Sequence, residues 1–503
     1  MAASAEESHV SDRPNVVFFE TDSHDGRTMG CMGHPSLRGA TPNMDRLARE
    51  GVLFRNAYCN NPICCPSRAS MWSGRWTHHC EGWNNYKGLE PGTRTMLDDL
   101  HDAGYRSRVI GKTDYLSGRH TIRARVSPWT RSARLDRPAY RMEGPTVHET
   151  GEVRVHERDW NLVDDAVTFL REDGKGDAPF WLHVGTGIPH PGFRTSRHYL
   201  EMIDEATVDV PELDETVHPV LEYHRRHKNW MHGLDDETVR LVRRIYFAMV
   251  AETDAMLGHL MDGLRDAGLA ENTIVVFTSD HGELAMEHGT FYKMSPYDAA
   301  TRVPLIMSGP GVARGRVTDE LVSLVDIYPT LMDIAAHETD ATLDGHSLMP
   351  LARGERDDAR PDWILSEFHG TSCDTGVFMV RRGDWKYVAY PGYDPQLYDM
   401  TNDPGEIHDL APSQPERVRE MDVLLRSIVD YEAVDAKVKA YDRAAFSQWR
   451  EKQRAEGTYR ANMAKVYSGW DHLADDDPRI VPWTDEDEAR IEAWLQETAD
   501  VGC

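Results

Sequence analysis

Several side chains suited to acid, base or metal-ligand chemistry each follow a short apolar run that predicts a buried strand. These side chains are Asp22, Lys112, His190, Asp280 and His281. Because ligands bind beyond the carboxyl ends of the strands in an open α/β sheet, we expect these side chains to converge there. Singly, each has a structural alternative, such as a capping carboxylate or a buried histidine. Together, and with a cysteine at position 64, they predict a catalytic site.

The acidic members of this set predict a metal centre. Asp22, Asp280 and His281 offer carboxylate oxygens and an imidazole to a divalent cation. Mostly oxygen ligands favour Ca²⁺, while the imidazole leaves Mg²⁺ or Mn²⁺ open. Such a cation polarises a bound hydroxyl and stabilises its deprotonated form.

Positive side chains in the same segments predict an anionic substrate group. Lys112, Lys293 and Arg68 can bind the oxygens of an oxyanion and offset charge that develops in a transition state. His190 and His218 titrate near neutrality, so either can protonate a leaving alcohol.

Cys64 opens the run Cys-Cys-Pro-Ser-Arg, which continues to Arg75 as Ala-Ser-Met-Trp-Ser-Gly-Arg. An isolated cysteine is most often a small buried hydrophobe or an inert thiol. A second alternative is a zinc site, since further cysteines and histidines lie nearby at Cys59, Cys65, His78, His79 and Cys80. Two adjacent cysteines followed at once by Pro and Arg fit no ordinary zinc-ligand spacing.

Length and charge limit the class of protein. A chain of 503 residues exceeds one ordinary core, so we expect one large domain and a smaller one. A formal net charge of −28 argues against nucleic acid and anionic membranes as partners, because both require a basic surface.

The start of the chain and its cysteine content indicate a reducing compartment. The first eight residues have neither a basic start nor an apolar core, and no run is long enough to span a bilayer. Seven cysteines are an odd number, and no Asn-x-Ser/Thr acceptor is present. We therefore expect a cytoplasmic protein that is not secreted.

Strand and helix patterns alternate over the first part of the chain. An apolar run at residues 15–19 precedes a helix that opens at Thr41-Pro42 and closes at Gly51, and a second run follows at residues 52–54. The rhythm continues with a helix at 96–101, strands at 108–110, 180–184, 273–277 and 303–307, and a long helix from about Val239 to Leu264. These elements predict an α/β sandwich around a large, mostly parallel sheet.

The pattern changes beyond about Pro361. Short runs at 363–368, 377–380 and 386–390, joined by Gly- and Asp-containing turns, predict a small antiparallel sheet. Helical patterns follow from Pro415. We therefore expect a catalytic α/β domain at residues 14–360 and a C-terminal subdomain at 361–503 with that sheet and terminal helices.

The run that begins at Cys64 resembles the signature of type I sulfatases. Three further segments resemble that family's ligand and lysine segments: TDSHDGRTMGCMGHP at 21–35, GKTD at 111–114, and FTSDHGELAMEHGTFYK at 277–293. The resemblance extends from about Asn15 to past Leu410 and so covers both expected domains. It implies the alkaline-phosphatase-like fold and a sulfuric ester hydrolase.

The resemblance also implies a modification of Cys64. In this family the first cysteine of the signature is oxidised by a maturase to formylglycine, whose hydrate carries two hydroxyls. One hydroxyl attacks sulfur and displaces the alcohol, and the other, once deprotonated, expels sulfate, an exit that a serine ester lacks. The oxygen of residue 64 then completes the metal set of Asp22, Asp280 and His281.

Three positions depart from the common sulfatase pattern. Ser23 stands where most sulfatases have a second Asp, with Asp25 nearby as a compensating ligand. His281 stands where an Asn is common, and Asp114 stands where a His is common, which leaves the base that regenerates the aldehyde unassigned.

Stretches such as WNNYKGL and WILSEFHG resemble one subgroup of the family, which shares these departures. That subgroup implies a substrate: the 2-O-sulfate of a glucuronate residue in a glycosaminoglycan-type saccharide. His218 matches a substrate-binding histidine there and His190 a more general one, and His369 is a further candidate with Lys112 and Lys293. Two alternatives stay open: a phosphonate or phosphate ester hydrolase on the same scaffold, and a silent module that binds sulfated glycans.

Overall fold

The computed structural model describes residues 13–118, 120–135, 137, 144–228, 233–469, 474 and 476–496. The N-terminal leader considered above lies outside these residues. Within the described ranges, no helix combines the length and the apolar character needed to cross a bilayer.

The strands, in chain order, are β1 (Asn15–Asp22), β2 (Val52–Tyr58), β3 (Arg106–Gly111), β4 (Thr146–His148), β5 (Phe180–Pro189), β6 (Arg194–Ser196), β7 (Thr273–Ser279), β8 (Leu305–Ser308), β9 (Arg316–Ser323), β10 (Trp363–Phe368), β11 (Val377–Arg382), β12 (Trp385–Ala389) and β13 (Gln396–Asp399). The first half of the helices is α1 (Pro42–Glu50), α2 (Cys64–Ser73), α3 (Thr77–Cys80), α4 (Met96–Asp102), α5 (Ile122–Trp129), α6 (Glu157–Glu172), α7 (Arg197–Leu200) and α8 (Pro219–His227). The second half is α9 (Asp236–Asp266), α10 (Asp298–Thr301), α11 (Ile327–Ala335), α12 (Met349–Arg353), α13 (Pro415–Ile428), α14 (Tyr431–Ala455), α15 (Tyr459–Ser468) and α16 (Asp485–Gln496).

The large sheet has the strand order β3-β5-β1-β7-β8-β2-β9. Neighbours are parallel from β3 to β7 and again between β2 and β9, which confirms the mostly parallel sheet expected from the sequence. β8 is antiparallel to both of its neighbours. The connection from β7 to β8 covers residues 280–304 and contains the 3₁₀ turn Glu287–Gly289 and the one-turn α10.

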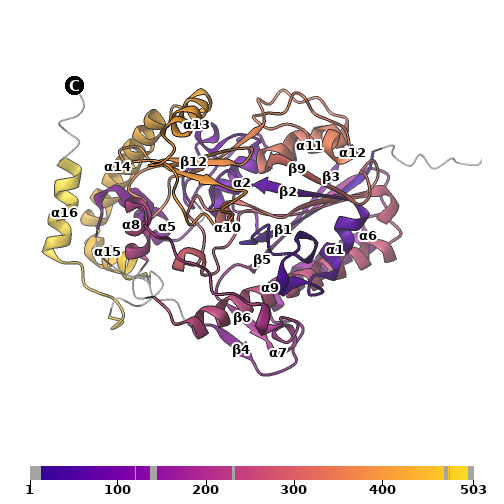
Figure 1. The fold of residues 1–503 in the computed structure, drawn as a ribbon, viewed down its shortest axis with the longest axis horizontal. Coiled ribbons are helices and arrows are strands. Elements are labelled where there is room, and N and C mark those ends of the chain that lie inside the picture. The colour runs from indigo at the N-terminus through magenta and orange to yellow at the C-terminus, as the bar shows by residue number, and fades with distance from the viewer. Residues whose placement is uncertain are drawn as a thin grey trace, which may run out of the picture.

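Alternate side chains of the central strands enter two cores, because successive residues of a strand point to opposite faces. Val17 and Phe19 of β1 pack on one face with side chains of α1, α6 and α9. Val16 and Phe18 pack on the other face with side chains of α2, α4 and α11. Helices therefore cover both faces, as Figure 1 shows for α9 and α11 on opposite sides of the sheet.

The C-terminal sheet is antiparallel, in the order β10-β11-β12-β13. One face, with Leu365 and Val380, packs against α13. The other face, with Ile364 and Met379, packs against residues of the large domain that include Ile63, the neighbour of Cys64. This sheet therefore supports one side of the Cys64 segment.

A buried ion cluster joins the C-terminal sheet to α10 of the large domain. Lys386 of β12 donates to Asp298 Oδ1 of α10 at 2.8 Å and to Glu406 Oε1 at 2.7 Å. The Lys386 side chain is fully buried, and both carboxylates are nearly so.

Replacing Lys386 with Met leaves two carboxylates buried without their main counter-charge. We expect K386M to lower the free energy of unfolding by about 3 kcal/mol, since breaking a buried ion pair is strongly destabilising. Urea unfolding followed by circular dichroism measures the change. Lys452 is exposed near the end of α14, so K452M is the matched control. Equal unfolding free energies for the two variants would contradict the expectation.

Candidate active site

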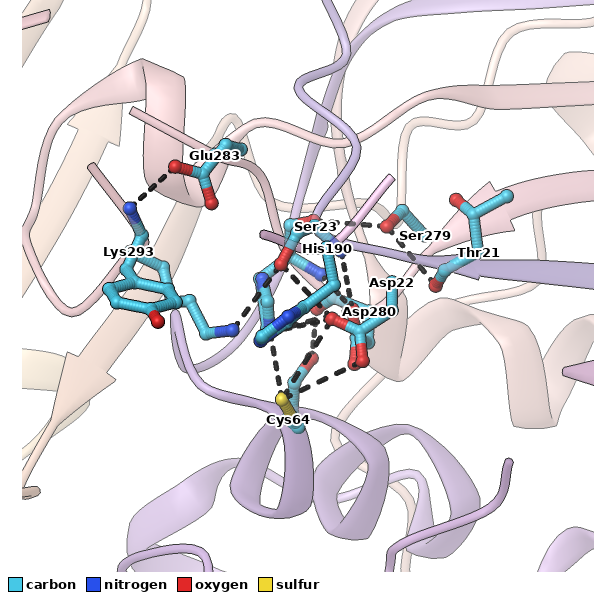
Figure 2. A network of polar contacts seen from close by, with 12 residues as sticks. Thr21, Asp22, Ser23, Cys64, His190, Ser279, Asp280, Glu283 and Lys293 are labelled. Carbon is cyan, nitrogen blue, oxygen red and sulfur yellow. Dashed lines mark hydrogen bonds and ion pairs between the residues drawn. The ribbon is translucent and has the colours of Figure 1, made fainter. Parts of the chain in front are cut away.

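The carboxyl edge of the large sheet gathers a cluster of polar side chains. Asp22 ends β1, Asp280 and His281 follow β7, and Cys64 is the first residue of α2. The pairing of β1 with β7 places Thr21 opposite Ser279, and the Asp280 N–H donates to Thr21 O at 3.3 Å. The side chains of Asp22, Cys64 and Asp280 point toward one another in Figure 2.

The cluster is tight around the thiol of Cys64. Cys64 Sγ lies 3.2 Å from His281 Nε2 and 3.9 Å from both carboxylate oxygens of Asp22. His281 Nε2 lies 3.7 Å from Asp22 Oδ1 and 3.5 Å from Asp280 Oδ1. All four residues are buried.

The donor set fits a divalent cation. One ligand atom from each of Asp22, Cys64, Asp280 and His281 lies within 4.8 Å of the others, and the described residues contain no second group of this kind. The His281 Nδ1–H donates to Gly282 O at 2.9 Å, which leaves the Nε2 lone pair facing the cluster. Two carboxylates beside a free imidazole nitrogen suit a divalent metal.

The charge states also suit a cation. Burial alone would raise the pKa of Asp22, but Lys112 and Lys293 hold that pKa well below its usual value, so the carboxylate is ionised. Burial, partly offset by Asp280, lowers the pKa of His281. A neutral imidazole and an ionised carboxylate are the forms that ligate metals.

Two lysines flank the cluster. Lys112 forms an ion pair with Asp22, and its Nζ lies 3.4 Å from Asp114 Oδ2. Lys293 Nζ donates to Ser23 Oγ at 3.3 Å (Figure 2). Both ammonium groups can therefore meet an oxyanion that approaches Cys64.

The sequence predicts that Arg68 binds substrate oxygens, but in the structure its side chain is buried and pairs with carboxylates of the protein. Its guanidinium is fully buried, with Nε 2.9 Å from Asp280 Oδ2 and Nη1 2.9 Å from Glu20 Oε2. Nη1 also donates to Lys112 O at 3.1 Å. Arg68 therefore fixes the orientation of Asp280 and the segment of Lys112.

Ser23 connects the metal cluster with Lys293. Its hydroxyl donates to Asp22 Oδ1 at 3.0 Å and accepts from Lys293. Ser23 has a φ of 65°, a left-handed conformation that is uncommon for residues with a Cβ. Asp25, the nearby carboxylate considered as a replacement ligand, is instead paired with Arg27 at 2.7 Å and is not a member of the cluster.

His190 stands between two cavities. A larger one of about 1040 Å³ is lined by Asp22, Lys112 and His190, and a smaller one of about 210 Å³ by His190 and Lys293. The His190 ring lies 5.7 Å from that of Tyr292, which also lines both cavities. Burial and then Lys293 lower the pKa of His190 to about 3, so its ring is neutral at pH 7.

The structure does not bring His218 and His369 into this cluster. His218 caps α8, stacks on Tyr390 with 3.9 Å between ring centroids, and lines a separate cavity. His369 is fully buried, with Nε2 at 3.3 Å from Glu367 Oε2.

The zinc arrangement considered for the cysteine-rich segment does not form. His78 Nδ1 is 2.6 Å from Glu367 Oε1, and His79 Nδ1 is 2.7 Å from Asp344 Oδ2. Cys59 contacts the carbonyl oxygen of Ala300. Of the cysteines and histidines in that segment, only Cys64 belongs to the candidate metal set.

A buried polar layer that the sequence patterns did not indicate lies behind the cluster. Glu20 accepts from Arg68 and lies 2.8 Å from His183 Nε2, with all three side chains fully buried. The available signal was an acidic residue and a histidine within two otherwise apolar strand runs. A charged residue inside such a run indicates a buried ionic network, because isolated charges are too costly to bury.

The fold and this site define a hydrolase of the alkaline-phosphatase-like class. A phosphonate monoester hydrolase of Agrobacterium radiobacter has a similar structure, with a TM-score of 0.68 and 24% identity over 82% of this chain and 96% of its own. A 2-O GAG sulfatase is similar with a TM-score of 0.67 and 26% identity, over 85% and 94% of the two chains.

Sequence comparison gives the family. The sulfatase family model matches residues 14–337, and the model of the N-sulphoglucosamine sulphohydrolase C-terminal region matches residues 286–429. Arylsulfatase K of Gallus gallus is 41% identical over 471 residues, 88% of this chain and 87% of its own. Arylsulfatase K of Homo sapiens is 41% identical over 87% of this chain and 86% of its own.

The chain therefore belongs to the sulfatase family and is a sulfuric ester hydrolase. The resemblance read from the sequence is confirmed, and arylsulfatase K is the subgroup that it indicated.

Proposed function

We propose that this sulfatase hydrolyses a saccharide sulfate monoester through a formylglycine made from Cys64, beside a divalent cation held by Asp22, Asp280, His281 and residue 64. The observation that supports this most is the position of the Cys64 thiol, 3.2 Å from His281 Nε2 and 3.9 Å from Asp22. A nucleophile at that position is in reach of every ligand in the candidate metal set.

The chain's own residues give this site its electrostatics. When bound, a divalent cation, most favourably Ca²⁺, supplies positive charge that lowers the pKa of a hydroxyl on residue 64. Lys112 and Lys293 keep Asp22 ionised and present two ammonium groups to the sulfate oxygens. Arg68 holds Asp280 in place from behind. These fixed charges stabilise the charge that develops on the sulfuryl group.

His190 is the candidate donor to the leaving alcohol. Its Nδ1 contacts the carbonyl oxygen of Pro191. Nε2 is therefore the nitrogen that can exchange a proton with the substrate. An anionic sulfate bound beside the ring raises the pKa of His190 from its low value, because a nearby negative charge favours the imidazolium. The ring can then carry a proton to the departing oxygen.

The proposed substrate is a carbohydrate 2-O-sulfate, such as 2-sulfoglucuronate. Two comparisons support it: the arylsulfatase K relatives at about two fifths identity, and the structural likeness to a 2-O GAG sulfatase. The cavities on both sides of His190 give a saccharide room to lie across the site.

A paired assay tests the reaction class. Protein co-produced with a formylglycine-generating maturase is given a nitrophenyl sulfate and the matched nitrophenyl phosphonate ester. We expect kcat/KM to be higher for the sulfate, because the sulfatase family model and the arylsulfatase K relatives match this chain. Faster phosphonate turnover would make the chain a phosphonate hydrolase on the same scaffold. Binding of sulfated saccharide without turnover of either ester would indicate a silent glycan-binding relative.

A further inference from the structure

The smaller cavity lies directly against the Cys64 segment. Ile63, which precedes Cys64, lines it, and so does Asn85, whose Oδ1 accepts from the Cys65 N–H at 3.1 Å. Its volume of about 210 Å³ exceeds the roughly 30 Å³ that one water molecule occupies in the liquid. A substrate group larger than a water molecule can therefore enter beside the nucleophile.

The lining of this cavity is positively charged. It includes Arg123 of α5, Lys228 directly after α8, and Lys293, and its lining residues include no Asp or Glu. This is the reverse of the whole chain, whose formal net charge is −28. A cavity with three basic side chains and no carboxylate suits an anion.

Among the three basic residues of this cavity, Lys228 is the one whose burial is least explained by contacts within the protein. It is 6% exposed, and no carboxylate among the described residues pairs with its ammonium group. Lys386, another buried lysine, has two carboxylate partners within 2.8 Å. Burial, followed by Arg123 and Lys293, holds the pKa of Lys228 well below its usual value. Burial of an unpaired ammonium is costly.

A helix C-terminus does not account for this arrangement. Lys228 is the C-cap of α8, where the helix dipole favours a cation. That gain is smaller than the free-energy cost of desolvating an ammonium ion. The missing compensation is an anion that enters from the cavity.

We infer that this cavity is a subsite for a second anionic group of the substrate, held by Lys228 and Arg123 while the scissile sulfate lies at Cys64. The inference rests on the proposed function, because it places both groups on one sulfated saccharide. Lys293 lies between the two positions: its Nζ donates to Ser23 beside Asp22, and its side chain lines the cavity. The occupant is the carboxylate of the sulfated sugar.

The C-terminal subdomain holds this subsite in shape. α5, which carries Arg123, packs against α14 and α15 through a shared core with Trp129 and Phe446. Directly after α5, Arg131 Nε donates to Asp442 Oδ2 at 3.0 Å in a fully buried pair. Helices of the C-terminal subdomain therefore support the element that carries Arg123.

The test compares two substrates that differ only in the second anion. One is a 2-O-sulfated uronic acid glycoside, and the other is its carboxyl-reduced analogue, in which a neutral CH₂OH replaces the carboxylate. The readout is the ratio of kcat/KM for the acid to that for the reduced analogue. We expect this ratio to exceed one in the unsubstituted enzyme and to fall by about 10- to 100-fold in K228M, the range for a lost charge-assisted hydrogen bond.

Three further variants make the result specific. R123Q should lower the same ratio, K228R should retain most of it, and K452M on the exposed end of α14 should leave it unchanged. R123Q also serves if K228M does not fold, because Arg123 is only half-buried.

The outcomes separate the two proposals. An equal loss on both substrates in K228M and R123Q, or an unchanged ratio, would overturn the subsite. Release of sulfate from neither substrate by the unsubstituted, matured enzyme would instead count against the proposed function.

Discussion

Replacing Cys64 with alanine abolishes sulfate release, with an expected loss of at least about 10⁴-fold in kcat, the scale seen when a covalent nucleophile is removed. The physical reason is the position of this side chain. Cys64 is the one residue in the cluster that can be converted to a nucleophile in contact with Asp22 and His281. The remaining charges can still bind sulfate but have no oxygen to deliver to sulfur. Release of sulfate from a nitrophenyl sulfate measures the effect.

Cys65 provides the matched control. It is also buried, but it is not a member of the candidate metal set. We expect C65A to keep turnover, and C64A to keep both its fold by circular dichroism and its affinity for a sulfated ligand. An inactive C65A beside an active C64A would transfer the role to the second cysteine.

Mass spectrometry of the peptide that contains both cysteines gives an independent readout. We expect position 64 to lose sulfur and gain an aldehyde oxygen when the maturase is present. An intact thiol at position 64 in fully active protein would contradict the formylglycine proposal, whatever the variants show.

Changing Asp280 to Asn should lower turnover by about 10³-fold and abolish the response to metal. Asp280 accepts from Arg68 Nε at 2.9 Å and from the His281 N–H at 2.9 Å, so its carboxylate is already oriented toward the cluster. The amide keeps the shape but removes one negative charge from a set that must balance a divalent ion, which weakens cation binding.

Metal removal tests the same centre without a substitution. After treatment with a chelator, we expect the unsubstituted protein to lose activity and to regain it with Ca²⁺, Mg²⁺ or Mn²⁺, each added alone. A metal at about 100 times its Kd should also stabilise the fold by about 2.7 kcal/mol, which thermal unfolding detects. D280N should show neither recovery nor stabilisation.

Asp254 supplies a control for loss of a buried carboxylate. It lies on α9 and accepts from the backbone N–H groups of Asn43 and Met44 at 3.0 and 2.7 Å, so it caps α1 rather than joining the cluster. D254N is expected to be less stable but to keep the metal response. Full activity of the chelated protein, or an unchanged metal response in D280N, would count against the metal centre.

Many elements of both domains could be predicted from local patterns. The helix expected from Val239 to Leu264 is α9 at Asp236–Asp266, and the strand expected at 363–368 is β10. These succeed because apolar periodicity and capping residues act within a few residues of one another. Such strands lead directly into Asp22, Asp280 and His281. The convergence of these side chains at one edge of the sheet could therefore also be predicted.

Ion-pair and hydrogen-bond partners from distant segments could not be predicted from the sequence. Arg68 binds Glu20 and Asp280, and Ser23 bridges Asp22 to Lys293, which lies 270 residues away in the chain. Which charge faces which depends on how helices and loops pack over the sheet. No local pattern distinguishes an arginine that binds substrate from one that orients a carboxylate.

The sequence by itself determined the family, the order of the main elements and the residues at the sheet edge, because each is written in short motifs or local periodicity. The tertiary structure alone decided the direction of β8, the removal of Asp25 from the ligand set by Arg27, and the cavity that Lys228 and Arg123 share. Those features arise where separate segments pack together, and burial fixes their energies only after the chain has folded.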